Sequence, residues 1–461
     1  MAELTGKKLV ILGLARQGIA LARFAAKSGA QVTVSDLRTE EQLRSSINEL
    51  NGLGIKYVLG EHPMSLLRGT DILAISGGVP ADIPLVQAAR SQGIMISNDS
   101  QEFVQRSPAA CIGITGSAGK TTTTALTGAM GKAAGRETWI GGNIGRPLIA
   151  ELGNIKPNHL VVQELSSFQL EIWQHSPPVA AVLNVTPNHL DRHKTMATYS
   201  NAKANILRFQ TKKNIAILSA DDEGAMALAP LVRGRLRLFS IERPVNDGAF
   251  ILNGHIWLRG ISGTETLVCP IEVIKLRGRH NLLNVCAAVT LADSVDIPVS
   301  GMVEAIRNFL GVDHRLELVA TINGVQYIND SIATTPERAL AAINSFDEPL
   351  ILLAGGKDKD MIWDNWACRV RERIAFVILF GDLAPALADH LEQIQTSGSK
   401  NVKLLQAKDL AEAVAIAGTV ATPGDVVLLS PGGTSYDAYI DFAERGEHFR
   451  SLVGNRRKKY S

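Results

Sequence analysis

The chain has 461 residues, which is too many for one ordinary hydrophobic core and predicts about three domains of roughly 150 residues each. Hydrophobic residues make up 46% of it and charged residues 20%, as in soluble globular proteins. A formal net charge of only +2 argues against a nucleic-acid or membrane partner, and neither a signal peptide nor an apolar run of about 18 residues occurs. The four cysteines are far apart, so we expect buried thiols in a reducing compartment and a cytoplasmic protein.

Three blocks of the chain each begin with a short apolar strand that runs into a glycine turn and then an amphipathic helix. We place these blocks at residues 1–107, 108–311 and 312–461. Alternating strands and helices predict mostly parallel sheets, so the expected fold class is α/β with three domains. In the third block, the expected strands lie near 325–328, 350–353, 375–380 and 425–429, and they predict a doubly wound sheet.

In the first block, an apolar strand is followed by a glycine turn, a helix near 17–28 and a second strand that ends at Asp36. This is a Rossmann-like arrangement, in which the amino terminus of the helix can bind a phosphate through its N–H groups. Ala15 stands where the dinucleotide fingerprint has its middle glycine, while Arg16 and Arg38 could add positive charge. A nucleotide-diphosphate ligand, a nicotinamide cofactor and a purely structural turn therefore all remain open.

The strongest motif is a glycine-rich loop, Gly113-Ile-Thr-Gly-Ser-Ala-Gly-Lys-Thr-Thr122, between an apolar strand and a helix predicted at 120–132. Backbone N–H groups of such a loop surround phosphate oxygens, Lys120 can reach the β- and γ-phosphates, and Thr121 can offer its hydroxyl to magnesium. The strict spacing of the motif requires glycine at a position where the chain has Ile114. The loop still predicts a nucleotide site.

Two further polar segments follow strands of the same block. Glu164 ends a strand predicted at 159–164, and a loop with His189 and His193 follows a strand predicted at 179–185. Ligands of parallel sheets collect at the carboxyl ends of the strands, and these side chains are of types that bind metal ions. In isolation, Glu164 is more often a solvated acid, and a structural role for the two histidines also stays open.

A series of motifs, taken with these residues, resembles the Mur ligase family over nearly the whole chain. Besides the phosphate loop, the motifs are Gly141-Gly-Asn-Ile-Gly145, Glu164-Leu-Ser-Ser-Phe-Gln-Leu-Glu171, Asn184-Val-Thr-Pro-Asn-His-Leu-Asp191, Arg279-His-Asn281, His314-Arg315, Asn329-Asp-Ser331 and Ser430-Pro-Gly-Gly-Thr-Ser435. The resemblance implies a Rossmann-like UDP-binding domain, a central P-loop ATPase domain and a carboxy-terminal Rossmann-like domain that receives an amino acid. It also implies a ligase that uses ATP and Mg²⁺ to add D-glutamate to UDP-N-acetylmuramoyl-L-alanine through an acyl phosphate, and we expect a monomer.

The resemblance also implies roles for individual residues. It assigns ATP to Gly116, Ser117, Ala118, Gly119, Lys120, Thr121, Thr122, Asn281, Arg315 and Asp330, and the UDP-sugar to Leu14, Ala15, Arg16, Asp36, Arg38, Gly77, Asn143 and His189. Of two magnesium sites, it assigns one to Thr121 and Glu164 and the other to His189 and a carbamylated Lys203, whose carbamate is an oxygen ligand. The implied catalytic set is Lys120, His189, Lys203 and Asn143. Without the resemblance, Lys203 would be taken for a surface lysine on a helix.

The glutamate pocket is where the chain departs from the family pattern. The resemblance assigns this pocket to Thr334, Lys359, Ser435 and Phe442. The family pattern Asp-Ser-Lys-Ala-Thr is here Asp330-Ser-Ile-Ala-Thr334, so Ile332 replaces a cation, for which Lys357 or Arg338 could substitute. The first alternative is therefore an L-glutamate-adding relative, and a less favoured one is a folylpolyglutamate synthase-like ligase.

Two hypotheses from other functional classes remain. A nicotinamide oxidoreductase would use the first glycine turn, but it leaves Gly119-Lys-Thr121 without a role. A non-catalytic nucleotide switch would use the phosphate loop, but it needs neither Lys203 nor the third domain.

Overall fold

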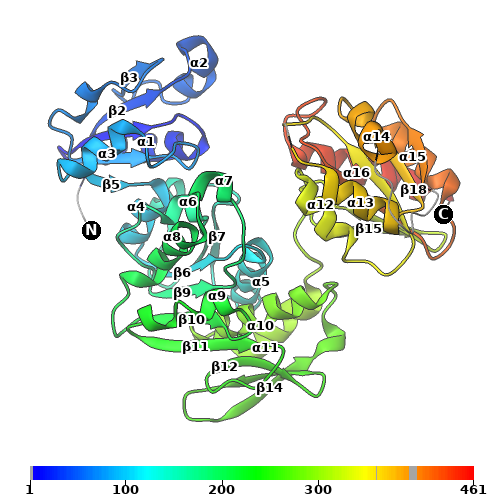
Figure 1. Ribbon diagram of the computed structural model, residues 1–461. Helices are drawn as coiled ribbons and strands as arrows, with labels where there is room; N and C mark the ends of the chain where they lie inside the picture. Colours follow the sequence, from blue (N-terminus) through cyan, green and yellow to red (C-terminus); the bar gives the residue numbers. More distant parts are fainter. Residues whose placement is uncertain (1–3, 360, 394–401, 461) are drawn as a thin grey trace. The chain divides into compact units, whose positions relative to one another are not determined.

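The computed structural model describes residues 4–359, 361–393 and 402–460, and these contain three separate β-sheets. Helices pack on each sheet, so the chain forms three α/β domains (Figure 1). The chain also divides into two compact units. The first unit comprises the described residues up to Lys275 together with Arg279–Phe309 and holds the first two sheets, and the second comprises Leu276–Gly278 with the described residues from Leu310.

The first domain is built on five parallel strands in the order β3-β2-β1-β4-β5. Its elements are β1 (Lys8–Leu12), α1 (Arg16–Lys27), β2 (Gln31–Asp36), α2 (Glu40–Asn48), β3 (Lys56–Leu59), β4 (Ile72–Ile75), α3 (Pro84–Ser91), β5 (Met95–Ser97) and α4 (Asp99–Arg106). The predicted first helix and the predicted strand that ends at Asp36 are both confirmed. The turn between β1 and α1 places the amino terminus of α1 at the carboxyl end of β1, as the Rossmann-like pattern predicted.

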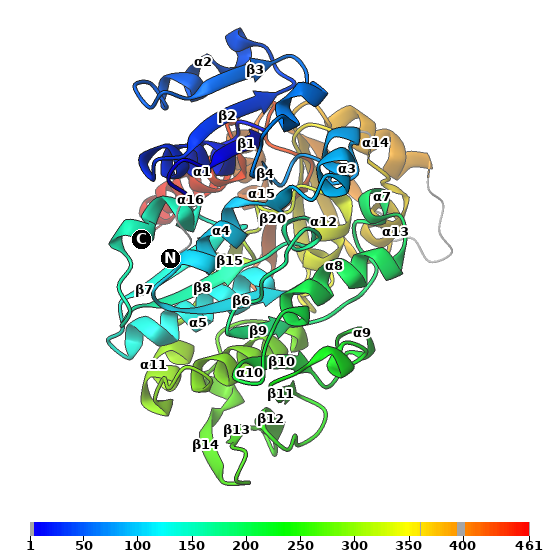
Figure 2. The same ribbon diagram turned by 90° about the vertical axis from the view of Figure 1, so that its left-hand side faces the viewer.

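The central domain has nine strands in the order β14-β13-β12-β11-β10-β9-β6-β8-β7, which Figure 2 shows stacked from β7 to β14. Its strands are β6 (Ala110–Thr115), β7 (Thr138–Gly142), β8 (Leu160–Glu164), β9 (Val179–Val182), β10 (Ile215–Ser219), β11 (Arg235–Ser240), β12 (Gly248–Leu252), β13 (His255–Arg259) and β14 (Glu265–Pro270). Its helices are α5 (Lys120–Ala133), α6 (Ser167–Leu170), α7 (Leu190–His193), α8 (Met196–Arg208), α9 (Glu223–Met226), α10 (Arg279–Asp293) and α11 (Val299–Asn308). Because the parallel strand β6 lies between β8 and β9, the segments that follow these three strands meet at one sheet edge.

The third domain has six strands in the order β15-β16-β20-β17-β18-β19, parallel except for β15. Its elements are β15 (Glu317–Ile322), β16 (Val325–Asn329), α12 (Pro336–Ile343), β17 (Leu350–Gly355), α13 (Asp364–Arg373), β18 (Phe376–Phe380), α14 (Ala384–Gln393), β19 (Lys403–Gln406), α15 (Leu410–Val420), β20 (Val426–Gly432) and α16 (Phe442–Tyr460). The four strands predicted for this block are confirmed. The last strand, β20, inserts between β16 and β17, so its carboxyl end lies between theirs.

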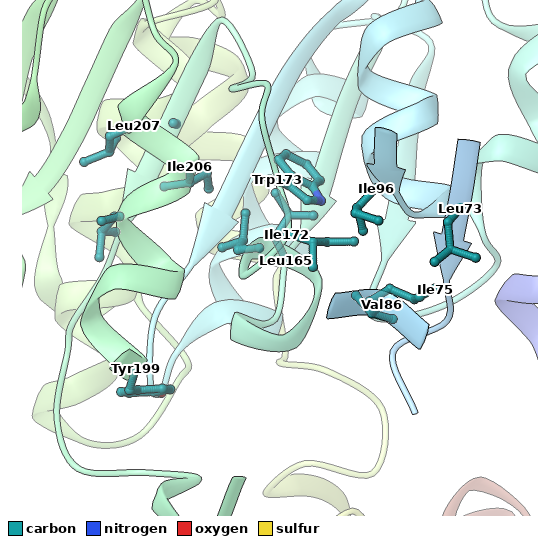
Figure 3. Packing of buried hydrophobic residues seen from close by; sticks show 14 of the residues in the cluster. Leu73, Ile75, Val86, Ile96, Leu165, Ile172, Trp173, Tyr199, Ile206 and Leu207 are labelled. Carbon is teal, nitrogen blue, oxygen red and sulfur yellow. The ribbon is translucent and has the colours of Figure 1, made fainter. Parts of the chain in front are cut away.

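The first and central domains share one hydrophobic core. Figure 3 shows side chains of the first domain packed in the same cluster as side chains of the central domain: Leu73, Ile75, Val86 and Ile96 from the former, and Leu165, Ile172 and Trp173 from the latter. Burial of apolar surface from both domains stabilises this junction, and it makes the two domains one compact unit.

Hydrogen bonds from the start of α4 also fix this junction. Asn98 donates from Nδ2 to the backbone oxygen of Gln169 (2.9 Å) and accepts at Oδ1 from Nε1 of Trp173 (3.1 Å). Gln101 accepts at Oε1 from the backbone N–H of Gln174 (2.6 Å). Buried polar groups that are satisfied across a junction restrict how its two sides can shift, so α4 positions the first domain on the central one.

Two expectations from composition can be compared with the structure. No helix in the described part of the chain is long and apolar enough to cross a membrane. Cys111, Cys269 and Cys286 are buried, but Cys368 is only half-buried, so the expectation of four buried thiols was wrong at that position. The reason is that Cys368 lies at the margin of the buried face of α13, beside the fully buried Ala367.

Candidate active site

The phosphate loop connects β6 to α5 at the carboxyl edge of the central sheet. Gly119, which precedes the helix, has a φ of +82°, a left-handed conformation that favours glycine, and a Cβ there would lie 2.3 Å from Oδ1 of Asn284. Nζ of Lys120 lies 2.8 Å from the backbone oxygen of Gly116 and 3.3 Å from that of Ser117. The lysine amine therefore lies across the loop, where it can meet a bound phosphate.

Contacts with the end of β9 and with α8 hold the loop in place. Asn184, which follows β9, accepts at Oδ1 from the N–H of Ala118 (2.8 Å), and its backbone oxygen accepts from the N–H of Ser117 (3.0 Å). Oγ of Ser117 donates to the backbone oxygen of Thr186 (2.9 Å) and accepts from the hydroxyl of Tyr199 (3.0 Å). A loop that is already fixed needs little reorganisation when a nucleotide binds.

Lys203 extends from α8 to the same loop. It is only 1% exposed, and its Nζ lies 2.8 Å from the backbone oxygen of Gly116 and 4.6 Å from the ring centroid of Tyr199. Burial and the charge of nearby Lys120 lower the pKa of Lys203 well below its ordinary value, while Glu164 acts in the opposite direction. Two lysine amines thus converge on one carbonyl oxygen, and the surroundings of Lys203 favour the neutral form of its amine.

Glu164 ends β8, beside the loop. It is 2% exposed, and its Oε1 accepts a hydrogen bond from Nδ2 of Asn143 (2.9 Å). Among the described residues, Oε2 of Glu164 has no hydrogen-bond partner. Burying a carboxylate oxygen without a partner is unfavourable, so this atom is a position where a cation would be stabilising.

The two histidines after β9 have different surroundings. His189 is exposed, has a φ of +53°, and contacts the ring of Phe168 edge-on at a centroid distance of 5.1 Å. His193 is buried, stacks on Phe168 at 5.0 Å, and has its Nε2 2.9 Å from Oγ of Ser167. His193 therefore has a packing role, whereas His189 lies at the surface of the same cluster.

A cavity of about 410 Å³ lies beside this cluster. Its lining includes Phe168, Arg192 and His193 of the central domain together with Asp82 and Arg90 of the first domain. Residues of the phosphate loop are not in that lining, so the cavity is separate from the expected nucleotide position.

The turn between β1 and α1 in the first domain is organised by Asp36. Oδ2 of this carboxylate accepts from the N–H of Leu14 (2.7 Å), and the guanidinium of Arg38 donates to both of its oxygens (2.9 and 2.7 Å). Burial acts to raise the pKa of Asp36, but these hydrogen bonds outweigh burial and lower the pKa to about 2. Arg38 is thus paired with Asp36, and the two side chains together line the end of β2.

The other predicted residues of this domain lie around the same turn. Ala15 caps the amino terminus of α1, and Arg16 begins that helix with an exposed side chain. Gly77 follows β4, and its N–H lies 3.4 Å from Oε1 of Gln17. The ends of β1, β2 and β4 therefore bring the predicted first-domain residues together.

In the second unit, Asp330 follows β16 and is 4% exposed. Its Oδ2 accepts from the hydroxyl of Ser430 (2.9 Å), and its Oδ1 accepts from the N–H of Leu316 (3.1 Å). Burial raises the pKa of Asp330 to about 7, although these hydrogen bonds and the charge of Arg315 oppose the shift. Asp330 thus joins the ends of β16 and β20 to the segment that carries Arg315.

Of the four residues predicted to bind the substrate glutamate, three follow neighbouring strands of this sheet and one begins a helix. Thr334 follows β16 and is half-buried, while Ser435 follows β20 and is 2% exposed. Lys359 follows β17, and its Nζ lies 4.9 Å from the ring centroid of Tyr436. Phe442 begins α16 and is half-buried.

The residues predicted to bind ATP are divided between the two units. Residues 116–122 and Asn281, which is 9% exposed on α10, belong to the first unit, whereas Arg315 and Asp330 belong to the second. Within the first unit, the loop residues lie with Lys203 and Glu164 at one sheet edge.

Three family models match successive parts of the chain. They are described as Mur ligase MurD-like, N-terminal domain (residues 7–98), Mur ligase middle domain (residues 114–292) and Mur ligase, glutamate ligase domain (residues 314–433). The chain belongs to the Mur ligase family.

Named Mur ligases match over almost their full length. The UDP-N-acetylmuramoylalanine–D-glutamate ligase of Symbiobacterium thermophilum is 42% identical over 450 residues, which cover 97% of this chain and 98% of the relative. The enzyme of the same name from Pelotomaculum thermopropionicum is 38% identical over 456 residues, 98% of each chain. The solved MurF ligase from Thermotoga maritima, in complex with ADP, matches with a TM-score of 0.57 and 18% identity over 100% of both chains, which shows the shared three-domain fold.

A magnesium ion at the phosphate loop of this Mur ligase fits the residues present. No group of three or more His, Cys, Asp or Glu side chains in the described ranges forms a metal-binding cluster. Magnesium is commonly held by one or two carboxylates together with nucleotide phosphates and water, so a many-residue cluster is not required. The unpartnered Oε2 of Glu164 and the hydroxyl of Thr121 at the start of α5 suit such a partly open site.

Sequence reasoning missed two residues of this Mur ligase site. Tyr199 contacts both Ser117 and Lys203, and its place four residues before Lys203 on a predicted helix was the available indication, since such residues share one face. Asn284 lies against Gly119 and accepts at Oδ1 from the hydroxyl of Thr123 (3.4 Å). No local pattern indicates Asn284, because it reaches the loop from a helix far along the chain.

Proposed function

We propose that this Mur ligase adds D-glutamate to UDP-N-acetylmuramoyl-L-alanine and converts ATP to ADP and phosphate, as a step of peptidoglycan precursor synthesis. The observation that carries the proposal is the near full-length identity of 42% to a ligase of that name. The phosphate loop, with Lys120 and Lys203 on one of its carbonyl oxygens, supports the ATP-dependent half of the reaction.

In the first step, a carboxylate oxygen of the L-alanyl group attacks the γ-phosphorus of ATP. The bond between that phosphorus and the β,γ-bridging oxygen breaks, which gives an acyl phosphate and ADP. Lys120 offsets the negative charge that develops on the phosphate oxygens, and the N–H groups at the start of α5 stabilise the β-phosphate. The carboxylate needs no proton transfer, so positioning and charge account for most of the catalysis.

In the second step, the neutral amine of glutamate attacks the acyl carbon. A tetrahedral intermediate forms, the bond from carbon to the phosphate oxygen breaks, and the nitrogen loses a proton as the amide forms. Lys359 pairs with a carboxylate of glutamate, and Thr334, Ser435 and Phe442 surround the rest of that molecule. Asn143 and His189 orient the L-alanyl end of the nucleotide substrate.

We assign two magnesium positions to the first unit. Thr121 and Glu164 would hold the first, and His189 and the carbamate of Lys203 would hold the second. Such ions supply positive charge beside the transferred phosphoryl group.

Carbamylation of Lys203 accounts for the surroundings of its amine. A neutral lysine nitrogen attacks the carbon of CO₂, a nitrogen–carbon bond forms, and one proton is lost, so a potential cation becomes an anion. Burial and the charge of Lys120 favour the neutral amine that this reaction needs. The product anion then faces Lys120 as an opposite charge, where two ammonium groups would repel each other.

The remaining assignments follow the resemblance. The UDP-sugar contacts Leu14, Ala15, Arg16, Asp36, Arg38 and Gly77, and ATP contacts Asn281, Arg315 and Asp330 in addition to the loop. We keep the domain boundaries at residues 107/108 and 311/312, a monomeric state and a cytoplasmic location as parts of the proposal. An L-glutamate-adding relative and a folylpolyglutamate synthase-like ligase are less favoured, because the relatives that match over the whole chain are named for D-glutamate.

Isotope transfer tests the acyl-phosphate mechanism. UDP-N-acetylmuramoyl-L-alanine with ¹⁸O in both carboxylate oxygens is incubated with the protein, ATP, Mg²⁺ and D-glutamate, and the phosphate released is analysed by mass spectrometry. We expect one ¹⁸O atom per phosphate, because the attacking carboxylate oxygen leaves with the phosphoryl group. Phosphate without ¹⁸O would mean that water, rather than the carboxylate, attacks ATP.

A further inference from the structure

The residues proposed for the glutamate pocket include fewer cations than glutamate has carboxylates. Glutamate carries two carboxylates, and a desolvated carboxylate is stabilised by a charge-assisted hydrogen bond. Of the four residues assigned to this pocket, Lys359 is the only cation, and Ile332 occupies the place of another. This inference rests on the proposed function, and it asks which side chain of this chain binds the second carboxylate.

Arg338 is held beside the segment that contains Ile332. It lies in the first turn of α12, and its Nη1 donates to the backbone oxygen of Ile332 (3.2 Å). Ile332 itself is fixed, because its N–H donates to the backbone oxygen of His314 (3.1 Å) and its oxygen also accepts from the N–H of Thr334 (2.9 Å). The guanidinium thus lies at the backbone oxygen of Ile332, which is two positions before Thr334 in the chain. Thr334 is one of the residues assigned to the glutamate pocket.

In the sheet, the strand that precedes Arg338 and the strand that precedes Lys359 are separated by one other strand. Arg338 and Thr334 follow β16, Ser435 follows β20, and Lys359 follows β17, in the spatial order β16-β20-β17. The backbones of β16 and β17 are therefore about 10 Å apart, with the end of β20 between them. A cationic side chain on α12, which follows β16, and one in the segment after β17 can therefore contact the two carboxylates of one small ligand near Ser435.

Lys357 is the other cation near this edge, and its position is less suitable. Its backbone N–H and oxygen both bond to Thr434 (2.8 and 2.9 Å), which places it on the same side of β20 as Lys359. A charge at Lys357 would therefore add to that of Lys359 and leave the side near Ile332 without a cation.

We infer that Arg338 binds one carboxylate of the incoming glutamate, opposite Lys359, and that it supplies the charge missing at Ile332. The planar guanidinium can donate two parallel hydrogen bonds to a carboxylate, which a single ammonium cannot. Arg338 is exposed, so its substitution leaves the core of the third domain intact.

The test compares Arg338→Gln with Arg338→Lys in the full-length protein. Both side chains can donate a hydrogen bond to the oxygen of Ile332, but only lysine carries a charge. We expect Arg338→Gln to raise the KM for D-glutamate by about 10- to 100-fold, the effect of a lost charge-assisted contact, and Arg338→Lys to raise it much less. The KM for ATP, the KM for the nucleotide substrate and the melting temperature should stay close to the wild-type values. Arg369→Gln, which replaces a half-buried arginine on α13 that pairs with Glu372, is the matched control and should change none of these three kinetic constants.

A second-site variant sharpens the test. In the Arg338→Gln background, Ile332→Lys should restore much of the affinity for D-glutamate, because it returns a cation to the same side of the pocket. Equal KM values for Arg338→Gln, Arg338→Lys and the wild type would overturn the inference, as would a large rise in KM for Lys357→Gln alone. If the wild-type protein does not use D-glutamate at all, the proposed function has failed before any variant is compared, so the two failures are distinct.

Discussion

Replacing Lys203 by alanine is expected to reduce ligase activity by at least about a hundredfold, since groups that hold charge at a transferred phosphoryl centre have effects of this size. The expected recovery is the more specific part of the prediction. Alanine removes the buried stem and leaves a space beside Gly116 and Tyr199, where a small carboxylic acid can take the place of the carbamate. Activity measured with increasing acetate or propionate should therefore rise in this variant and not in the wild type.

Lys203→Met is the matched control for this experiment. Methionine keeps an unbranched side chain of similar volume, so stability should change less than with alanine, where loss of a buried side chain costs about 2–5 kcal/mol. It cannot be carbamylated and leaves no space for an added acid. We therefore expect it to be inactive and beyond rescue, and a fully active Lys203→Met protein would contradict the carbamate.

Replacing Lys120 by methionine should lower kcat by about a thousandfold, as for other cations that act on a transferred phosphoryl group. The fold should be little affected, because the amine donates to oxygens of its own loop, those of Gly116 and Ser117, and the side chain is not part of the core. The measurements are kcat from phosphate release and the melting temperature of each variant.

Lys132→Met is the control for Lys120→Met, since it removes an exposed lysine from the last turn of the same helix. It should retain the activity and the melting temperature of the wild type. If Lys120→Met also retains its activity while it is folded, Lys120 does not contact the phosphates and the assignment of the loop is wrong.

The parts of the fold and of the site that depend on local patterns could be predicted from the sequence. The strand–glycine–helix alternation predicted three α/β domains, and the loop before α5 was located because a phosphate cradle needs glycine and lysine at close spacing. Glu164 was a reasonable ligand candidate because it ends a strand at the edge where the loop also lies.

Other parts depend on contacts between distant segments, which periodicity does not show. The amine of Lys203 is buried because α8 packs beneath a loop 87 residues earlier in the chain, so resemblance alone suggested its role. Asn284 reaches the loop residue Thr123 from 161 residues away, and Arg38 proved to be paired with Asp36. At Ile332, the family pattern predicted a cation, and in the tertiary structure the guanidinium of Arg338, on the next helix, donates to the backbone oxygen of Ile332.

The most direct test of the central claim is the release of phosphate from ATP by purified protein with UDP-N-acetylmuramoyl-L-alanine and Mg²⁺, with D-glutamate and L-glutamate offered in separate reactions. We expect release that depends on D-glutamate, together with a product whose mass equals that of the nucleotide substrate plus one glutamate residue. Release with L-glutamate alone would keep the ligase chemistry and contradict the assigned amino acid, and no release with either would contradict the muramoyl substrate itself.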